Sequence, residues 1–327
     1  MGNNIKRIGV LTSGGDAPGM NAALRAVVRA CKYYDLQSVG IRQGYEGLIN
    51  NDMIDLGPRS VRNIINHGGT ILKTARSLEF KTPEGRQKAY THLKNNNIDA
   101  LVVIGGDGSF TGANIFYQEF GVPFIGIPGT IDNDIFGTDF TIGYDTALNT
   151  VIDAIDKLRD TATSHDRVFF VEVMGRDAGF IALNSGIASG AQDILIPEQR
   201  DSVDELCTSL ERSEKSGKKS SIVVVAEGEK LGGVFEMAKQ VQTRHPEYDI
   251  RVTVLGHIQR GGSPSCHDRV LASRLGIAAV EGLLEGKTNL MAGIRSNKLV
   301  FTPIDEAIKK HNEIDSELIK VAKILAI

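Results

Sequence analysis

Two carboxylates spaced two residues apart stand out in Pro128–Asp134, which reads PGTIDND. The segment follows a short apolar run, so Asp132 and Asp134 fall at the end of a predicted strand. An extended chain sends side chains i and i+2 to the same side, so both carboxylates can face one substrate. One can hold a metal ion while the other accepts a proton from a hydroxyl group, as phosphoryl transfer requires. A turn rich in Asp and Asn is the structural alternative.

Two glycine-rich segments each follow a predicted strand and precede a predicted helix: Thr12–Asn21 (TSGGDAPGMN) and Gly105–Ser109 (GGDGS). Glycine lets the backbone approach an anion closely, and a helix N-terminus adds N–H groups and a favourable dipole. Asp107 is placed to hold Mg²⁺, which binds carboxylate and phosphate oxygens. Helix capping is the alternative explanation for each segment. The two segments together predict phosphate binding.

Cationic side chains accompany these loops at further predicted strand ends. Most arginines in proteins are solvated, but arginines beside glycine-rich loops form forks that bind phosphate. The candidates are Arg76, Arg167, Arg176, Arg251, His257 and Arg260.

The scaffold for these residues is an alternation of strands and helices. Apolar runs such as Ile8–Leu11, Ala100–Ile104 and Ile222–Ala226 predict buried strands, and Asp145–Asp160 has the apolar period of a helix. Such alternation implies parallel sheets, which bind ligands beyond the carboxyl ends of their strands. About ten strands are expected, too many for one small sheet, so the sequence predicts two α/β domains.

The composition is that of an ordinary globular protein apart from glycine, which supplies 36 of 327 residues. The 40 acidic and 37 basic residues nearly cancel, so no strong field favours nucleic acid. No apolar run approaches the ~18 residues that a membrane span needs, and no secretory signal is visible. The three cysteines, Cys31, Cys207 and Cys266, form no CxxC pair. We therefore expect a cytoplasmic protein with no nucleic-acid or membrane partner.

Five segments occur in a fixed order: TSGGDAPGMN, GGDGS, PGTIDND, EVMGR and GHIQRGGSP. Together they resemble the bacterial ATP-dependent 6-phosphofructokinases over nearly the whole chain. The resemblance implies two three-layer α/β domains of mostly parallel sheet. Residues 1–142 and 258–308 would bind ATP and Mg²⁺, and residues 143–257 and 309–327 would bind fructose 6-phosphate. The implied reaction moves the γ-phosphoryl group of ATP to the sugar 1-hydroxyl in glycolysis.

The resemblance also implies a role for each matching residue. The catalytic positions would be Thr130, Asp132, Asp134 and Arg176, with Asp132 as the base. ATP would contact Gly14, Arg76, Ser77, Gly106, Asp107, Gly108 and Ser109, with Asp107 as the Mg²⁺ ligand. Fructose 6-phosphate would contact Thr130, Ile131, Asp132, Arg167, Met174, Gly175, Arg176, Glu227, Arg251, His257 and Arg260.

The family further implies an allosteric homotetramer with shared active sites, because Arg167 and Arg251 would reach into a neighbouring subunit. An effector site would use Arg25, Arg29, Arg59, Arg159, Gln192, Lys218 and Lys219. This sequence departs from the family there: Pro58, Gln192, Ser216 and Ser220 replace a frequent Arg, Glu, Lys and His. An amide binds Mg²⁺ more weakly than a carboxylate, so we expect an anion-binding site with weakened ADP activation. A solvated helix face is the alternative for Arg25 and Arg29.

Four other functions stay open. Pyrophosphate-dependent relatives typically carry Asp and Lys where Gly108 and Gly129 stand, so the two glycines favour ATP. NAD or lipid kinases share a GGDG loop but lack the other segments. A nicotinamide dehydrogenase would rest on Gly106, Gly108 and Gly112, whose last spacing is one residue too long. A non-catalytic paralogue would be expected to lose Asp132 or Arg176, and both are present.

Overall fold

The computed structural model describes residues 5–199, 202–218 and 220–326. In it the chain forms two compact units, each assembled from separate stretches. The first contains residues 1–131, 135–146 and 260–312, and the second contains 132–134, 147–259 and 313–327. The predicted α/β class with mostly parallel sheets is confirmed. The assignment of ATP to one domain and the sugar to the other stays a prediction.

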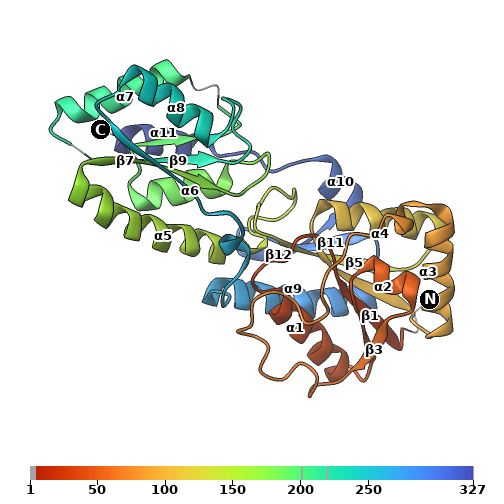
Figure 1. The fold of residues 1–327 in the computed structure, drawn as a ribbon. Coiled ribbons are helices and arrows are strands. Elements are labelled where there is room, and N and C mark those ends of the chain that lie inside the picture. The colour runs from red at the N-terminus through yellow and green to blue at the C-terminus, as the bar shows by residue number, and fades with distance from the viewer. Residues whose placement is uncertain (1–4, 200–201, 219, 327) are drawn as a thin grey trace. The chain divides into compact units, whose positions relative to one another are not determined.

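The first unit is built on an eight-stranded sheet with helices on both faces. Figure 1 shows α1 and α9 on one face of this sheet and α3 and α4 on the other. In sheet order the strands are β12 (Lys298–Pro303), β11 (Leu290–Arg295), β5 (Phe124–Thr130), β4 (Ala100–Gly105), β1 (Arg7–Thr12), β2 (Gln37–Ile41) and β3 (Met53–Leu56), and β6 (Ile142–Gly143) pairs with β5. The helices are α1 (Met20–Tyr33), α2 (Tyr45–Asn50), η1 (Glu79–Lys81), α3 (Pro83–Asn95), α4 (Asp107–Phe120), α9 (Cys266–Leu284) and α10 (Ile304–Lys309).

The central strands of this sheet are mostly apolar because helices cover both of their faces. All residues of β4 and β5 are buried. β1, β4 and β5 are neighbours and run parallel, so their carboxyl ends meet at one edge. That edge carries the two glycine-rich segments and the start of PGTIDND.

The second unit has a four-stranded parallel sheet. Figure 1 shows α7 and α8 on one face and α5 and α6 on the other, and the reverse view shows α11 beside α6. In sheet order the strands are β10 (Asp249–Val254), β7 (Arg167–Val173), β9 (Ser221–Ala226) and β8 (Asp193–Leu195). The helices are α5 (Tyr144–His165), which begins in the first unit, α6 (Phe180–Ser189), α7 (Val203–Lys215), α8 (Val234–Arg244), η2 (Gly256–Arg260) and α11 (Ser316–Leu325).

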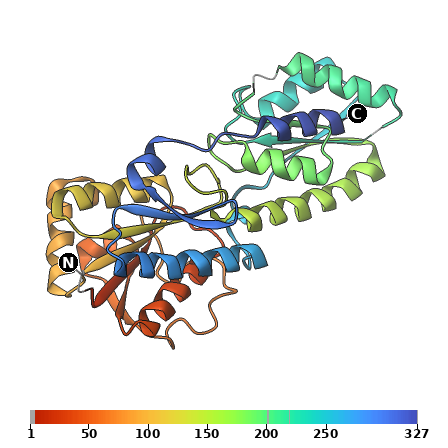
Figure 2. The ribbon, with the colours of Figure 1, turned by 180° about the vertical axis from the view of Figure 1, so that it is seen from behind.

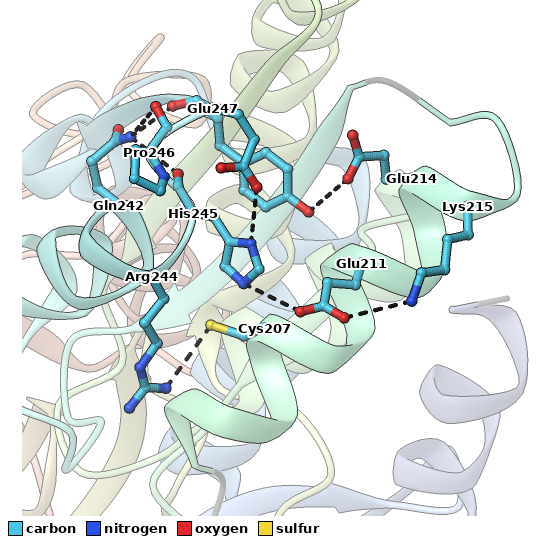
Figure 3. A network of polar contacts seen from close by, with 10 residues as sticks. Cys207, Glu211, Glu214, Lys215, Gln242, Arg244, His245, Pro246 and Glu247 are labelled. Atoms are coloured by element: carbon cyan, nitrogen blue, oxygen red, sulfur yellow. Dashed lines mark hydrogen bonds and ion pairs between the residues drawn. The ribbon is translucent and has the colours of Figure 1, made fainter.

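A polar network ties α7 to the turn that follows α8 (Figure 3). The His245 ring lies between two carboxylates, 3.4 Å from Glu211 and 3.1 Å from Glu247. The same ring stacks on Tyr248, with centroids 4.9 Å apart. Burial and the bond to Glu214 raise the pKa of the Tyr248 hydroxyl to about 12, so it remains a donor at neutral pH. The network fixes the approach to β10.

Helices α3 and α4 are joined by a two-pronged ion pair. The Arg86 guanidinium contacts both Glu119 oxygens at 2.6 Å and also donates to the carbonyls of Phe80 and Lys81. The Arg86 side chain is 8% exposed, so it depends on these acceptors. The hydrogen bonds from Arg86 hold the pKa of Glu119 below its ordinary value.

We expect Glu119→Gln to lower the free energy of unfolding by about 2 kcal/mol, because it strips the charge partner from a buried guanidinium. Lys88→Gln, which breaks the solvent-exposed pair with Glu79, is the matched control and leaves the free energy of unfolding nearly unchanged. A carboxyl group whose pKa is lower in the folded than in the unfolded protein stabilises the fold fully at pH values above its unfolded pKa. That contribution is lost as the pH falls through the folded pKa. The difference in free energy of unfolding between wild type and Glu119→Gln, measured by urea unfolding, therefore narrows below about pH 4. Equal losses in the two variants would contradict the assignment.

Candidate active site

The loops after β1 and β4 touch in the first unit. A Cβ at Gly105 would lie 2.5 Å from the Ser13 carbonyl oxygen, so only glycine fits there. Gly14 has φ +86°, and a Cβ there would lie 3.3 Å from Ser109 Oγ. A Cβ at Gly106 would lie 3.9 Å from the Cβ of Thr130, at the end of the neighbouring strand β5. The structure thus brings together Gly14, Gly106, Ser109 and Thr130, as the sequence predicted for the ends of neighbouring strands.

Helix α4 begins inside the second glycine-rich loop. Gly106 occupies its N-cap and no side chain caps the helix. Gly108 has open space where a Cβ would stand, whereas Ser109 is buried and its carbonyl accepts a 2.5 Å bond from the Tyr45 hydroxyl. Burial raises the pKa of Tyr45, which keeps it a donor. The first turn of α4 therefore presents backbone N–H groups suited to phosphate oxygens.

Asp107 is the half-exposed carboxylate at this helix start. Among the residues described, no three His, Cys, Asp or Glu side chains gather as a metal-holding group. A protein-only metal cage is therefore not built from the described part of the chain. One carboxylate that shares a cation with nucleotide phosphates is the donor set typical of Mg²⁺, and Asp107 at a phosphate-type loop fits it.

Arg76 and Ser77 lie in the loop after β3. Thr12 at the end of β1 donates to the Lys73 carbonyl at 2.9 Å, which ties this loop to the same sheet edge. Ser77 Oγ accepts a 3.2 Å bond from Phe80 N, so this hydroxyl is bound to the backbone of η1. The Arg76 residue is exposed.

Asp132 and Arg176 form an ion pair in the second unit. The Arg176 Nε lies 3.3 Å from Asp132 Oδ2, and the side chains are 53% and 1% exposed. Asp132 is therefore a buried carboxylate, and the guanidinium paired with it is half-exposed. Asp134 is half-buried and Ile131 is buried.

The backbone that carries Arg176 is held in an uncommon conformation. Gly175 has φ +141° and Arg176 has φ +53°, in the left-handed region. Glu227 accepts bonds from both amides, at 3.3 Å from Gly175 N and 2.8 Å from Arg176 N. The Gln259 side chain accepts a further 3.1 Å bond from Met174 N. The sequence predicts Glu227 as a sugar contact, and in the structure its carboxylate fixes the turn Met174–Arg176.

Arg167 and Arg251 share one carboxylate, Asp249. Arg167 Nε lies 2.8 Å from Asp249 Oδ2, and Arg251 Nη2 lies 2.9 Å from Oδ1. The bond from Arg167 and the charge of Arg251 hold the pKa of Asp249 below its ordinary value. Arg167 begins β7 whereas Arg176 follows its end, so the strand separates them by about 20 Å. The structure does not bring Arg167 and Arg251 to the Asp132–Arg176 pair.

The segment GHIQRGGSP is divided between the two units, after Gln259. His257 is exposed in η2 and groups with the second unit. Arg260 groups with the first, where its guanidinium lies against Gly15 and donates to the Asp16 carbonyl at 3.3 Å. Arg260 thus accompanies the first glycine-rich loop.

The predicted effector residues fall into two sets. In the first unit, Arg25 and Arg29 are one turn apart on α1 and Arg59 is exposed. Burial and then the charge of Arg29 lower the pKa of Arg25. In the second unit, Arg159 donates to the Ser189 carbonyl, while Gln192 accepts from Lys218 at 2.7 Å and donates to the Ala326 carbonyl at 2.8 Å. Lys219 lies outside the described residues.

Sequence reasoning missed two residues of these networks. Gln259 is fully buried within the GHIQRGGSP segment, where only Arg260 and His257 were singled out. Asp249 stands two residues before Arg251 on β10, so strand alternation places both on one side. That spacing was the available signal.

Within residues 5–199, 202–218 and 220–326, no helix is long and apolar enough to span a bilayer.

Comparison with known proteins gives one consistent result. The sequence profile of the family described as Phosphofructokinase matches residues 7–283. The chain is 58% identical to ATP-dependent 6-phosphofructokinase 2 of Bacteroides thetaiotaomicron, over 99% of both chains. It is 54% identical to ATP-dependent 6-phosphofructokinase 1 of Thermus thermophilus, over 99% of this chain and 100% of that protein.

Solved structures agree on the fold. Phosphofructokinase from Saccharomyces cerevisiae superposes with a TM-score of 0.90 at 37% identity, over 98% of this chain and 50% of that one, so this chain spans about half of the yeast chain. A pyrophosphate-dependent phosphofructokinase from Marinobacter aquaeolei has a TM-score of 0.84 at 21% identity, over 98% and 92% of the two chains, which speaks for the fold alone. The predicted resemblance is confirmed, and the chain belongs to the phosphofructokinase family.

Proposed function

We propose that this chain transfers the γ-phosphoryl group of ATP to the 1-hydroxyl of D-fructose 6-phosphate, which yields fructose 1,6-bisphosphate and ADP in glycolysis. The observation that carries the proposal is the ion pair between the buried Asp132 and Arg176. It occurs in a chain that is 54–58% identical to proteins named ATP-dependent 6-phosphofructokinase. The nucleotide phosphates bind the loops of Gly14 and Gly106–Ser109, with Arg76 and Ser77 beside them. The sugar phosphate binds the second unit through the turn Met174–Arg176, Glu227 and His257.

The chain's own residues then divide the chemistry. Asp132 accepts the proton of the sugar 1-hydroxyl, because it is a buried carboxylate held beside Arg176, the cation that attends the phosphoryl group. Arg176 offsets the negative charge on the moving phosphoryl group, and the left-handed turn fixed by Glu227 holds it ready. Thr130 and Ile131 orient the hydroxyl, and Asp134 supports the acidic side of the site.

Asp107 would hold Mg²⁺ together with the nucleotide phosphates, and the bound ion would supply charge neutralisation there. Removal of Mg²⁺ with a chelator abolishes turnover if this assignment holds.

One assay tests the function. The purified protein receives fructose 6-phosphate with ATP, pyrophosphate or NAD⁺, each with and without Mg²⁺, and the products are quantified. ADP and fructose 1,6-bisphosphate in equal amounts, only with ATP and Mg²⁺, is the expected result. Turnover that prefers pyrophosphate would instead support the pyrophosphate-dependent alternative. A cytoplasmic location follows from the substrates, and the three unpaired cysteines are consistent with it.

A homotetramer with shared active sites is part of the proposal. Arg167 and Arg251 are bound by one Asp249 and lie a strand's length from Arg176, which supports their serving a neighbouring subunit together. We expect mixtures of Asp132→Ser and Arg251→Ala subunits, both nearly inactive alone, to recover up to about a quarter of wild-type activity by random assembly. Mixtures of Arg167→Ala with Arg251→Ala are the control and recover none, because both defects lie in the same donated set. Equal behaviour of the two mixtures would contradict shared sites.

We also propose an anion-binding effector site between subunits with weak ADP activation, to which Arg25, Arg29, Arg59, Arg159, Lys218 and Lys219 contribute. The amide of Gln192 is 2% exposed and is already occupied by Lys218 and the Ala326 carbonyl, which leaves it a poor Mg²⁺ ligand. ADP and phosphoenolpyruvate are titrated against fructose 6-phosphate saturation. Phosphoenolpyruvate shifts the curve and Mg·ADP shifts it by less than about twofold. Strong Mg·ADP activation that Arg25→Ala abolishes would refute this.

A further inference from the structure

Asp268, in the first turn of α9, is a fully buried carboxylate that none of the assigned roles uses. Its Oδ1 accepts from Gly143 N at 2.9 Å, and its Oδ2 accepts from Thr146 N at 2.8 Å and from the Thr146 hydroxyl. Gly143 and Thr146 flank the start of α5. The carboxylate of one helix therefore caps the N-terminus of another, where its charge is favoured.

The bonding is reciprocal. Ser265 Oγ caps α9 by accepting from Asp268 N at 3.2 Å and donates to Asp145 at 2.5 Å. Ser265 N donates to the Thr146 hydroxyl at 2.9 Å. The starts of α5 and α9 thus close each other through a cluster of Asp145, Thr146, Ser265 and Asp268. Burial raises the pKa of Asp268, while the bonds from Thr146 and Gly143 counteract that shift.

The cluster is connected to Thr130 by two short steps. Gly143, which Asp268 binds, is the register partner of Thr130 in the β5–β6 pair. Thr141 Oγ1 donates to the Thr130 carbonyl at 2.6 Å. The end of β5 is therefore held by β6, and β6 is held by Asp268.

The first glycine-rich loop rests on the same cluster. A Cβ at Gly19 would lie 2.6 Å from Ile142 Cγ2 and 3.6 Å from Asp268 Cβ. A Cβ at Gly143 would lie 2.7 Å from Ala17 Cβ. Glycine at these two positions lets the loop after β1 and the strand beside β5 close around one carboxylate.

We propose that Asp268 is a positioning residue for the reaction: it fixes β6 and, through Thr141 and Gly143, the end of β5 from which Thr130 and then Asp132 follow. This inference rests on the proposed function, in which Thr130 orients the hydroxyl and Asp132 accepts its proton. Asp268 touches no substrate in this scheme. Its loss misplaces the groups that act, so it lowers kcat more than it weakens substrate binding.

Asp268→Asn tests the proposal with little change of size. One oxygen becomes an NH₂ group that faces an N–H donor whichever way the amide turns, so either the bond to Gly143 N or the bond to Thr146 N is lost, and β6 is held less firmly. We expect kcat to fall at least tenfold while KM for ATP changes less than about threefold. Amide exchange, measured by mass spectrometry, quickens in peptides that cover residues 124–143.

Ser265→Ala is the matched control, because it removes the α9 cap and leaves the Asp268–Gly143 bond in place. We expect it to lower Tm about as much as Asp268→Asn does, with kcat within twofold of wild type. Thr141→Val cuts the second connection to Thr130 and lowers kcat on its own, which keeps the test decisive if Asp268→Asn does not fold. The double variant Asp268→Asn/Thr141→Val loses no more kcat than the stronger of the two single variants, because both substitutions act on the same segment.

A folded Asp268→Asn protein with wild-type kcat overturns the proposal. So does a Ser265→Ala protein that loses as much kcat, because the effect would then follow stability alone. A wild-type enzyme inactive with ATP and fructose 6-phosphate overturns the proposed function. In that case the rate of amide hydrogen exchange in residues 124–143 of Asp268→Asn, compared with wild type, still decides the positioning claim.

Discussion

Asp132→Ser is expected to lower kcat at least ~10²-fold while KM for fructose 6-phosphate changes less than about threefold. The serine hydroxyl cannot accept the proton of the sugar 1-hydroxyl at neutral pH, so the chemical step loses its base. The phosphate contacts of the sugar do not involve this carboxylate, so binding survives. Arg176 is 53% exposed and is solvated once its partner is gone, which leaves the fold intact. Steady-state kinetics with circular dichroism of the same preparation measures both effects.

Asp139→Ser is the matched control for this substitution. Asp139 is an exposed carboxylate seven residues further along the chain, where it accepts a bond from Ser296 N. Its replacement removes one negative charge near the same segment and leaves kcat within twofold. An Asp132→Ser enzyme with unchanged kcat would show that this carboxylate is not the base.

Gly108→Asp is expected to lower kcat/KM for ATP at least ~10²-fold with Tm nearly unchanged. A side chain at this position meets open space, so the protein itself accommodates it. A carboxylate in the first turn of α4 is favourable for the helix but repels nucleotide phosphates. Two unit charges 4 Å apart at an effective dielectric constant of 20 cost about 4 kcal/mol, enough for such a loss.

Gly108→Ala separates bulk from charge, and we expect it to stay within about threefold of wild type. Gly129, the other position that distinguishes the pyrophosphate enzymes, cannot serve this test. A Cβ there would lie 3.2 Å from Ile104 and from Met20, so a larger side chain disturbs the core first. Full ATP activity in Gly108→Asp, or better turnover of the native enzyme with pyrophosphate, would contradict the donor argument.

The strand ends that carry the candidate site were predictable from sequence, because each strand contains an apolar run that glycine follows within a few residues. The predicted helix Asp145–Asp160 runs from Tyr144 to His165 in the structure, so its start was predictable to within one residue although the side chain that caps it lies 122 positions beyond Thr146. β11 and β12 were missed. They form a hairpin whose two-residue turn, Ser296 and Asn297, adopts positive φ without a glycine to signal it.

The bond of Asp249 to Arg167 and the roles of Gln259 and Asp268 could not be read from local pattern. Each acts through residues distant in sequence: Asp249 on Arg167, Gln259 on Met174 and Asp268 on Gly143. A lone polar residue in an apolar helix or strand gives no sign of its partner. Such links become visible only when the sheet register is known.

Because both units are assembled from separate stretches, their order of synthesis matters. The core of the first unit includes Met291, Ile304 and Ala307, and its sheet receives β11 only after the second unit's main stretch has been translated. At typical ribosomal speeds, on the order of ten seconds pass between residue 146 and residue 307. During that interval β5 lacks the partner strand that β11 later supplies along its edge. An unpaired strand edge is a template for pairing with other chains, so the nascent first unit is open to association until β11 has been made.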